Sequence, residues 1–255
     1  MSKNFELMQE AGISLNVPAI DNPKSSLAAS NRKAKGKVTE AYFNQQDAVT
    51  REESLKLVQS VFLSRIETPA RAVVFAGIDS GNGCSWICAQ AADTLAGQRL
   101  GSVCLVDANL RSPSLPELFG VTNHYGLTDS LSKRGSIRDF AKLVRSDNLW
   151  LLSCGSLGTE SSGLLNSETM KTRVSELRKE FDYVLIDSPP LNTYSDGIAL
   201  AQVADGLVLV LEANSTRREP AVKVAENLRA AQIKILGAVL NKRTFPIPES
   251  LYKLM

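Results

Sequence analysis

A glycine-rich stretch between an apolar run and a predicted helix is the part of this sequence best suited to bind an anion. Its sequence is Gly77-Ile78-Asp79-Ser80-Gly81-Asn82-Gly83-Cys84-Ser85-Trp86, and the apolar run before it covers residues 72–76. Backbone N–H groups in such a turn, and at the start of the next helix, can face a phosphate. A phosphate loop has the pattern G-x-x-x-x-G-K-[ST], and Cys84 takes the place of its lysine. The stretch keeps the frame of a phosphate loop without its charge, so a tight turn without a ligand is an equally good interpretation of this segment alone.

Two aspartates follow other apolar runs and could hold a metal ion. Asp107 comes after residues 103–106, and Asp187 comes after residues 183–186. Four apolar residues followed by aspartate are typical of a Walker B strand, whose carboxylate binds Mg²⁺, usually through water. Ser85 stands where the hydroxyl of a phosphate loop binds the same ion. Each aspartate alone could equally cap a turn, but together they are the candidate catalytic residues.

An asparagine ends the last apolar run of the chain. Asn241 follows residues 235–240, and Lys242 and Arg243 come directly after it. The Asn241 amide could contact the edge of a nucleotide base, and a simple turn is the alternative. The single histidine, His124, is expected in a surface loop and not in a catalytic role.

These residues can act together only if the apolar runs before them are neighbouring strands. Strands are predicted at 71–76, 102–107, 149–153, 182–187, 206–211 and 235–240. Helices are predicted at 50–64, 84–96, 115–119, 127–131, 137–144, 162–180, 195–203 and 217–231. Apolar strands that alternate with helices predict a doubly wound α/β fold with a mostly parallel sheet covered on both faces. Ligands bind at the carboxyl ends of the strands in such sheets, where the candidate residues stand.

Composition limits the classes of protein that this chain can belong to. With 44% hydrophobic residues, 22% charged residues and a net charge of +2, the sequence is typical of a soluble globular protein. So small a net charge gives no field that would favour nucleic acid, and no nucleic-acid partner is expected. No apolar run reaches the ~18 residues that a membrane span needs, and the first residues lack a signal core, so a cytoplasmic location is expected.

Three segments are predicted. Residues 1–50 are expected to form a flexible extension with a basic cluster at 32–37, residues 51–245 the α/β domain, and residues 246–255 a tail. Thr50 and Glu53 have the spacing of a capping box at the start of the first helix. The four cysteines lack C-x-x-C spacing and are expected to be reduced and mostly buried.

Taken together, these segments resemble the bacterial tyrosine kinases of capsule and exopolysaccharide systems, which belong to a deviant class of P-loop ATPases. The resemblance extends from about residue 52 to residue 240. Residues 80–85 match the family's Walker A motif, residues 103–115 its D-x-D-x-R motif, and residues 183–190 its Walker B motif. Segments 204–206, 216–219 and 237–241 are also similar. The resemblance implies a P-loop NTPase fold.

The resemblance also implies a nucleotide site. The residues expected to contact ATP or ADP are Ser80, Gly81, Asn82, Gly83, Cys84, Ser85, Trp86, Arg111 and Asn241. Those expected to hold Mg²⁺ are Ser85, Asp107 and Asp187.

The sequence departs from the family at positions that carry its chemistry. Cys84 replaces the Walker A lysine, and Asn109 replaces the second aspartate of D-x-D-x-R. The lysine's hydrogen bond to charged phosphate is worth roughly 1.5–3 kcal/mol, or about tenfold to hundredfold in affinity. The family's oligomerisation motif E-x-x-R-x-x-R is Glu53, Lys56 and Gln59 here, and the C-terminal tyrosine cluster is reduced to Tyr252. The ending of the chain is similar to tails of the exopolysaccharide-associated branch.

The departures favour a kinase-like protein with impaired or lost ATP hydrolysis and weak or absent nucleotide binding. By resemblance, it would act in exopolysaccharide assembly through a membrane chain-length (co-polymerase) partner at the inner face of the plasma membrane, with homo-oligomerisation possible. One alternative is an active ATPase or tyrosine autokinase that takes a charge from Arg111 or from a neighbouring subunit. A second is a partitioning-type positioning ATPase. A third is redox sensing by Cys84, because a thiol at a helix N-terminus has a lowered pKa.

Overall fold

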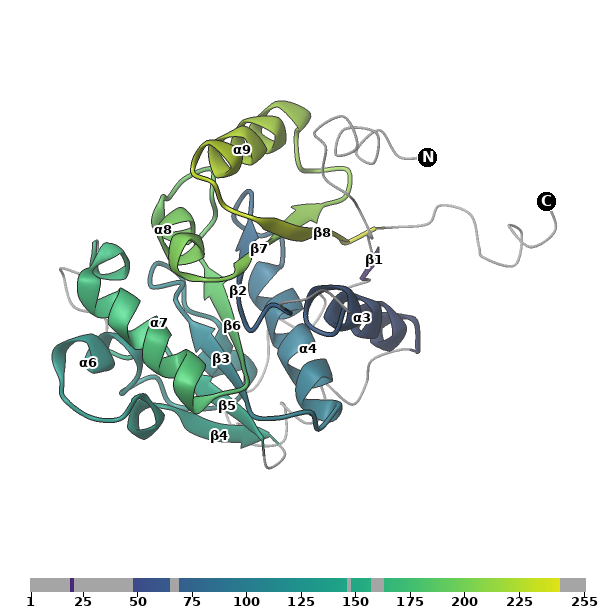
Figure 1. Cartoon of the computed structure of the whole chain (residues 1–255). Coiled ribbons are helices and arrows are strands. Elements are labelled where there is room, and N and C mark those ends of the chain that lie inside the picture. Colours follow the sequence, from purple (N-terminus) through teal and green to yellow (C-terminus); the bar gives the residue numbers. More distant parts are fainter. Residues whose placement is uncertain (1–18, 21–47, 65–68, 146–147, 157–162, 244–255) are drawn as a thin grey trace, which may run out of the picture.

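An eight-stranded sheet forms the centre of the molecule (Figure 1). The structure is a computed structural model, and it describes residues 19–20, 48–64, 69–145, 148–156 and 163–243. The strand order is β1-β8-β7-β2-β6-β3-β5-β4, and every neighbouring pair is parallel except β4 and β5. The strands are β1 (Ala19–Ile20), β2 (Ala72–Gly77), β3 (Val103–Asp107), β4 (Lys142–Arg145), β5 (Leu149–Leu152), β6 (Tyr183–Ser188), β7 (Gly206–Glu212) and β8 (Ile235–Asn241).

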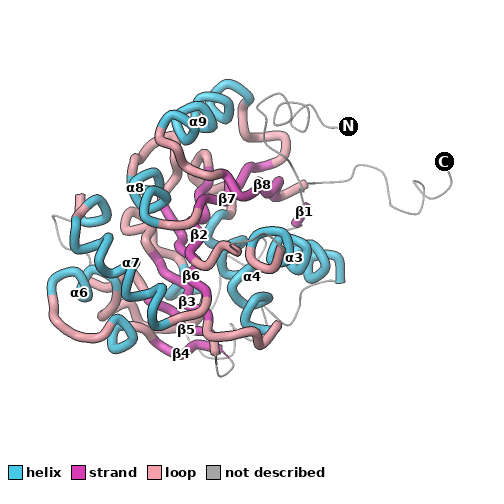
Figure 2. Tube along the Cα trace, in the orientation of Figure 1, coloured by secondary structure: helices cyan, strands magenta, loops and turns pink. Residues whose placement is uncertain are grey.

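Helices cover both faces of the sheet (Figure 2). They are α3 (Ala48–Val61), α4 (Cys84–Gly97), α5 (Leu115–Leu118), α6 (Leu127–Ser132), α7 (Glu168–Glu180), α8 (Asp196–Val203) and α9 (Arg218–Ala230), with short 3₁₀ turns at Ile137–Phe140 and Leu164–Asn166. Helices α3 and α4 pack on one face, and α7, α8 and α9 pack on the other. The chain therefore has three layers, as the alternation of strands and helices predicts.

The central strand β2 shows why the strand sequences are apolar throughout. Side chains alternate between the two faces of a strand, and all six residues of β2 are buried. Val73 and Phe75 face the core under α3 and α4, whereas Val74 and Ala76 face the core under α7 to α9. A strand with helices on both faces has no solvent-facing side, so the sequence carries no polar alternation.

The predicted doubly wound P-loop fold is confirmed, and most predicted elements lie within a few residues of the observed ones. Three predictions about individual helices were wrong. Thr50 does not cap the first helix, because it is a buried residue inside α3. The helix predicted at 137–144 is a short 3₁₀ turn followed by the edge strand β4. The helix predicted from residue 162 begins at Glu168.

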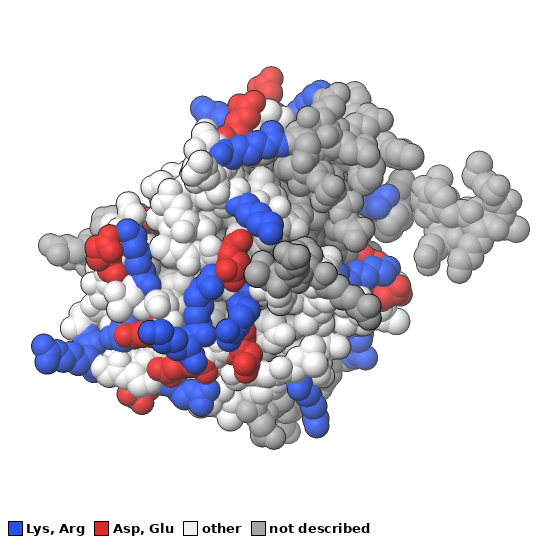
Figure 3. Space-filling model, in the orientation of Figure 1, with Lys and Arg blue, Asp and Glu red and all other residues white. Residues whose placement is uncertain are grey.

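The ends of the chain lie largely outside the described residues. Within the predicted extension, Ala19–Ile20 forms the strand β1, which pairs with β8. The tail with Tyr252 lies outside the described part. No helix in the described ranges combines the length and the apolar character needed to cross a bilayer. On the face shown in Figure 3, basic side chains have acidic side chains among them.

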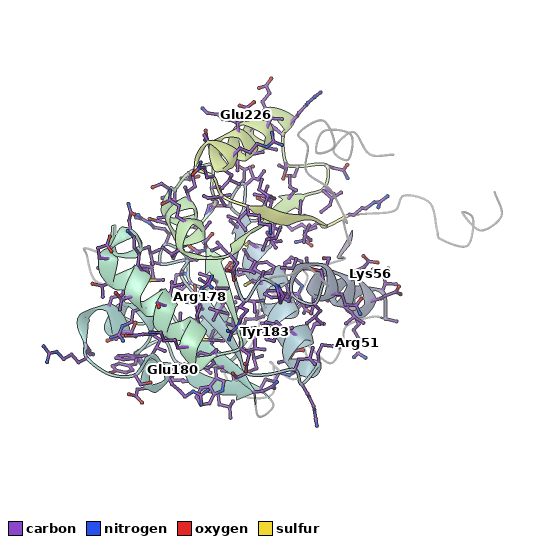
Figure 4. All side chains as sticks on the ribbon, viewed as in Figure 1. Arg51, Lys56, Arg178, Glu180, Tyr183 and Glu226 are labelled. Atoms are coloured by element: carbon purple, nitrogen blue, oxygen red, sulfur yellow. The ribbon has the colours of Figure 1, made fainter. Side chains whose placement is uncertain are left out.

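Asp205 connects the start of the central strand to its neighbours. One carboxylate oxygen accepts hydrogen bonds from the N–H groups of Arg71 and Ala72, both at 2.8 Å. The other accepts a hydrogen bond of 2.5 Å from Arg178 on α7. Arg178 is labelled on α7 in Figure 4. Asp205 thus joins the amino ends of β2 and β7 to the helix that covers them.

Substitution of Asp205 by alanine should lower the free energy of unfolding by about 2–3 kcal/mol, because it leaves two strand N–H groups without their acceptor. Urea unfolding followed by circular dichroism measures this change. Arg178→Ala is the matched control and should cost about 1 kcal/mol or less, since the pair is partly exposed. A loss below about 0.5 kcal/mol for Asp205→Ala would contradict this role.

Candidate functional site

The glycine-rich stretch forms a loop that joins β2 to α4. Gly81 and Gly83 have positive φ angles of 84° and 80°, a conformation that glycine adopts without strain. Gly83 lies directly before the first turn of α4. Within the described part of the chain, the backbone N–H groups of residues 82–85 donate to no protein acceptor. A row of unpaired N–H groups at a helix N-terminus is the structure that binds phosphate.

The carbonyl side of the loop is held by residues at the end of β8. The Asn241 amide donates to the Asn82 carbonyl at 2.8 Å, and the Lys242 ammonium donates to the Gly81 carbonyl at 2.8 Å. The Asn82 side chain accepts a hydrogen bond from the N–H of Asp79 at 2.6 Å and donates to the Thr216 hydroxyl at 3.4 Å. The shape of the loop is therefore fixed by two other parts of the chain, the end of β8 and Thr216.

The start of the loop is also paired with the segment after β6. The N–H groups of Leu191 and Asn192 donate to the carbonyls of Gly77 and Ile78. The Asn192 amide donates to the Asp79 carboxylate at 3.1 Å. These bonds place the Walker B segment against the loop.

Asp107 and Asp187 lie side by side beneath the loop. They are direct partners in the parallel register of β3 and β6, and both are 0% exposed. Asp107 accepts hydrogen bonds from the N–H groups of Asn109 and Leu115 at 3.2 and 3.3 Å. Neither oxygen of Asp187 accepts a hydrogen bond of normal geometry. A buried carboxylate without a partner requires a cation or a proton.

Burial changes the acidity of both carboxyl groups. Desolvation, together with the neighbouring charge of Asp187, raises the pKa of Asp107 to about 8. Desolvation raises the pKa of Asp187 to about 7, against the opposing effect of the nearby Ser85 hydroxyl and Cys84 thiol. The site therefore retains a proton on at least one carboxyl group at neutral pH when no cation is present.

The thiols near the carboxylates have low acidity. Desolvation and the charge of Asp187 raise the pKa values of Cys84 and Cys88 well above the usual range. This direction is opposite to the lowered Cys84 pKa that the redox hypothesis predicts, so the structure does not favour a reactive thiolate at position 84. All four cysteines are free, and three of them are buried, as expected.

Arg111 contacts the segment that follows β6. Its guanidinium is 4.9 Å from the centre of the Tyr194 ring and 3.8 Å from the Asp196 carboxylate. The alternative in which Arg111 replaces the Walker A lysine stays a prediction. Ser80 is exposed at the tip of the loop, and Trp86 packs partly buried against the α4 face of the core.

The residues present fit a nucleotide phosphate and Mg²⁺. The unpaired N–H groups of residues 82–85 would face the phosphate, and Ser85, Asp107 and Asp187 would hold the ion, directly or through water. The fit rests on two observations, the row of free N–H groups and the buried, unpartnered carboxylate of Asp187. Asn241 is fully buried, with its amide bonded to the loop and its oxygen bonded to the N–H of Lys242. In this structure Asn241 supports the loop, and its predicted contact with a base stays a prediction.

Sequence reasoning missed three residues of the site. Thr216, Asn192 and Lys242 each contact the loop from positions more than 100 residues away in the sequence. Only Asn241-Lys242 at the end of an apolar strand gave a signal, because polar residues at strand ends meet at one edge of a parallel sheet.

Comparison with known proteins places the chain among P-loop NTPases. The ParA family, described as NUBPL iron-transfer P-loop NTPase, matches residues 70–253. The tyrosine-protein kinase YwqD of Bacillus subtilis is 31% identical over 71% of this chain and 76% of its own length. The tyrosine-protein kinase CpsD of Streptococcus agalactiae is 29% identical over 54% of this chain and 61% of its own length.

Similarity to solved structures supports the fold. The kinase domain of the Escherichia coli tyrosine kinase ETK superposes with a TM-score of 0.81 at 21% identity, covering 97% of this chain and 98% of that domain. The similarity to tyrosine kinases inferred from the motifs is thus confirmed.

The free energy of unfolding should fall as the pH rises from about 4 to about 8. The folded-state pKa values of Asp107 and Asp187 lie above the unfolded value of about 3.9. Their stabilising contribution is therefore complete below about pH 4 and is lost progressively up to the folded-state pKa values, because the unfolded chain releases these protons while the folded protein still retains them. Urea unfolding with a chelator present should show a loss on the order of 5 kcal/mol between pH 5.5 and 8.5, because each group contributes about 1.4 kcal/mol per pH unit up to its folded-state pKa.

Asp187→Asn should remove about half of this pH dependence, because it removes one titrating group and relieves the other. Glu226→Gln, a substitution of an exposed carboxylate on α9 (Figure 4), is the control and should leave the dependence unchanged. The same slope in the wild-type protein and in Asp187→Asn would refute the assignment.

Proposed function

Since this chain belongs to the ParA family of P-loop NTPases and has tyrosine kinases among its relatives, we propose that it is a kinase-like protein of exopolysaccharide or capsule biosynthesis, or of the regulation of that process. Its ATP hydrolysis is impaired or lost. It acts by binding a membrane chain-length protein, and nucleotide binding to its loop is weak or absent.

One observation carries this proposal. Cys84 occupies the lysine position of a loop whose other parts are kept: the left-handed glycines, the free N–H groups, and the two carboxylates beneath. Backbone N–H groups can still bind phosphate, but charge on the transferred phosphoryl group is stabilised chiefly by the lysine and the metal. Loss of the lysine therefore reduces turnover more than it reduces binding.

Asn109 acts in the same direction. It stands two residues after Asp107, where the family's motif has a second aspartate, and its side chain oxygen accepts a hydrogen bond from the N–H of Ser112 at 3.2 Å. A neutral amide in this position contributes less to binding a divalent cation than a carboxylate. Asn109 thus weakens the binding of a metal ion, and Cys84 weakens the binding of phosphate.

A role through partners is the function that such a site leaves open. The resemblance to capsule kinases supports a membrane chain-length protein as the partner and a location at the inner face of the membrane. Oligomerisation through α3 would use Glu53, Lys56 and Gln59, which stand in place of the family's motif (Lys56 is labelled in Figure 4). In this structure Lys56 bonds to Glu52 and Glu53 of its own helix, at 2.9 and 2.8 Å.

An active tyrosine autokinase or ATPase of the same pathway is the second candidate. The unpartnered carboxylate of Asp187 favours it, because that group is suited to a metal ion. Iron transfer, which appears in the description of the matching family, has less support. Three of the four cysteines are buried, and in the described ranges no group of three or more His, Cys, Asp or Glu side chains is arranged to hold a metal ion.

Calorimetry with Mg-ADP should detect weak or no binding to the wild-type protein and binding about tenfold to hundredfold tighter to Cys84→Lys, because the new ammonium restores a charged hydrogen bond to phosphate. Cys84→Ala is the control, since it removes the thiol without adding charge, and it should behave like the wild type. Equal affinities of Cys84→Lys and Cys84→Ala would count against a defect at this position.

ATP hydrolysis by the purified protein decides between the two candidates. The proposal expects a rate at the level of the buffer blank. Hydrolysis that is abolished by Asp187→Ala would overturn the proposal in favour of the active enzyme, and phosphate on Tyr252 in mass spectra would identify an autokinase.

A further inference from the structure

We propose that Lys242 is a positioning residue of the phosphate loop and supplies from β8 the positive charge that Cys84 does not. The inference rests on the proposed function in one respect only, namely that the ligand of the loop carries phosphate. It does not depend on whether the protein turns over ATP.

The backbone at Lys242 directs its side chain back over the loop. Lys242 follows the last residue of β8 and has a φ angle of 55°, a left-handed conformation that costs a lysine roughly 1–2 kcal/mol. Its N–H donates to the Asn241 side chain at 2.8 Å. Its ammonium reaches the Gly81 carbonyl at 2.8 Å, and the side chain is 38% exposed. Strain of this kind persists only where surrounding contacts hold it.

The polarity of the peptide groups explains how Lys242 can act on a ligand that lies across the loop. In a trans peptide, the C=O and the N–H of one unit point in opposite directions. Lys242 donates to the carbonyl of Gly81, so the N–H of Asn82 points away from β8. Asn241 donates to the carbonyl of Asn82, so the N–H of Gly83 also points away from β8.

These two N–H groups are the first two of the unpaired row at residues 82–85. Hydrogen bonds in a chain polarise one another. A cation bonded to the Gly81 carbonyl therefore strengthens the Asn82 N–H as a donor to an anion. The positive charge behind the loop also attracts that anion directly.

Glu212 carries a negative charge beside Lys242, so its substitution tests whether Lys242 acts through its positive charge. Its carboxylate lies 3.1 Å from the Lys242 ammonium, at the end of β7, and is 21% exposed. It holds the ammonium in place and offsets part of its positive charge. Removal of this negative charge should therefore strengthen phosphate binding, whereas removal of the Lys242 charge should weaken it. A purely mechanical support of the loop would not give effects of opposite sign.

The test compares ligands with increasing phosphate content. Adenosine, AMP, ADP and pyrophosphate are titrated calorimetrically, with Mg²⁺, into the full-length wild-type protein, Lys242→Met, Lys242→Arg and Glu212→Gln. Lys242→Met keeps the apolar stem and removes the charge. Lys234→Met is the matched control, because Lys234 is exposed and lies before the opposite end of the same strand. All variants are repeated in the Cys84→Lys background, and thermal unfolding reports whether each variant is folded.

We expect Lys242→Met to weaken ADP and pyrophosphate binding about tenfold, AMP binding about threefold and adenosine binding not at all. Lys242→Arg should restore most of the loss, and Glu212→Gln should tighten ADP binding about threefold. The loss should shrink as salt is raised, because the charge is partly exposed. In the Cys84→Lys background the loss should be smaller, since a second cation is then present.

If Lys242→Met leaves the ADP affinity unchanged, both in the natural chain and in the Cys84→Lys background, this inference is overturned and the proposed function is not. An equal loss for adenosine and ADP, insensitive to salt, assigns Lys242 a purely structural role and also overturns it. If neither ADP nor pyrophosphate binds in either background, the phosphate site and this inference are both contradicted. ATP hydrolysis by the wild-type protein overturns the proposed loss of activity and leaves the inference intact if the Lys242→Met loss persists.

Discussion

Desolvation of two neighbouring carboxylates is the constraint around which the carboxyl end of this sheet is arranged. The parallel register of β3 and β6 aligns Asp107 with Asp187, and both are fully buried. Two negative charges so placed are unstable without a compensating positive charge. Backbone N–H groups satisfy part of Asp107, whereas Asp187 has none and faces two neutral thiols. Protons or a cation must complete the site, so its ligand state and its stability are linked.

The positions of these residues were predictable because they follow from strand geometry. A strand that is buried on both faces is apolar throughout, and the first polar residue after it marks the edge where ligands bind. Asp107, Asp187 and the glycine loop all follow such runs, and the structure brings them together. The edge strand β4 was missed because its short sequence, Lys142-Leu143-Val144-Arg145, has charges at both ends and follows a helical turn. Charged ends suit a strand at the edge of a sheet, but four residues are too few for their pattern to be distinctive.

The support of the loop could not be predicted in the same way. Lys242 and the Gly81 carbonyl are 161 residues apart in the sequence, and only the pairing order of β2, β7 and β8 brings them together. The left-handed backbone at Lys242 also gives no signal, because lysine rarely adopts it. Sequence patterns therefore predict which strand ends contribute to a site, but not which side chains cross from one end to another.

Loss of the loop lysine is compatible with the fold because residue 84 does not determine the shape of the loop. Gly81 and Gly83 provide the left-handed turns, and β8 holds the two carbonyls. A cysteine at position 84 leaves all of these contacts unchanged. In the folded protein a lysine here would act mainly on a bound phosphate and on the buried carboxylates. Its absence therefore affects phosphate binding and phosphoryl transfer more than it affects the stability of the fold. The proposed function, action by binding with a site that lacks the lysine's charge, is therefore compatible with an intact fold.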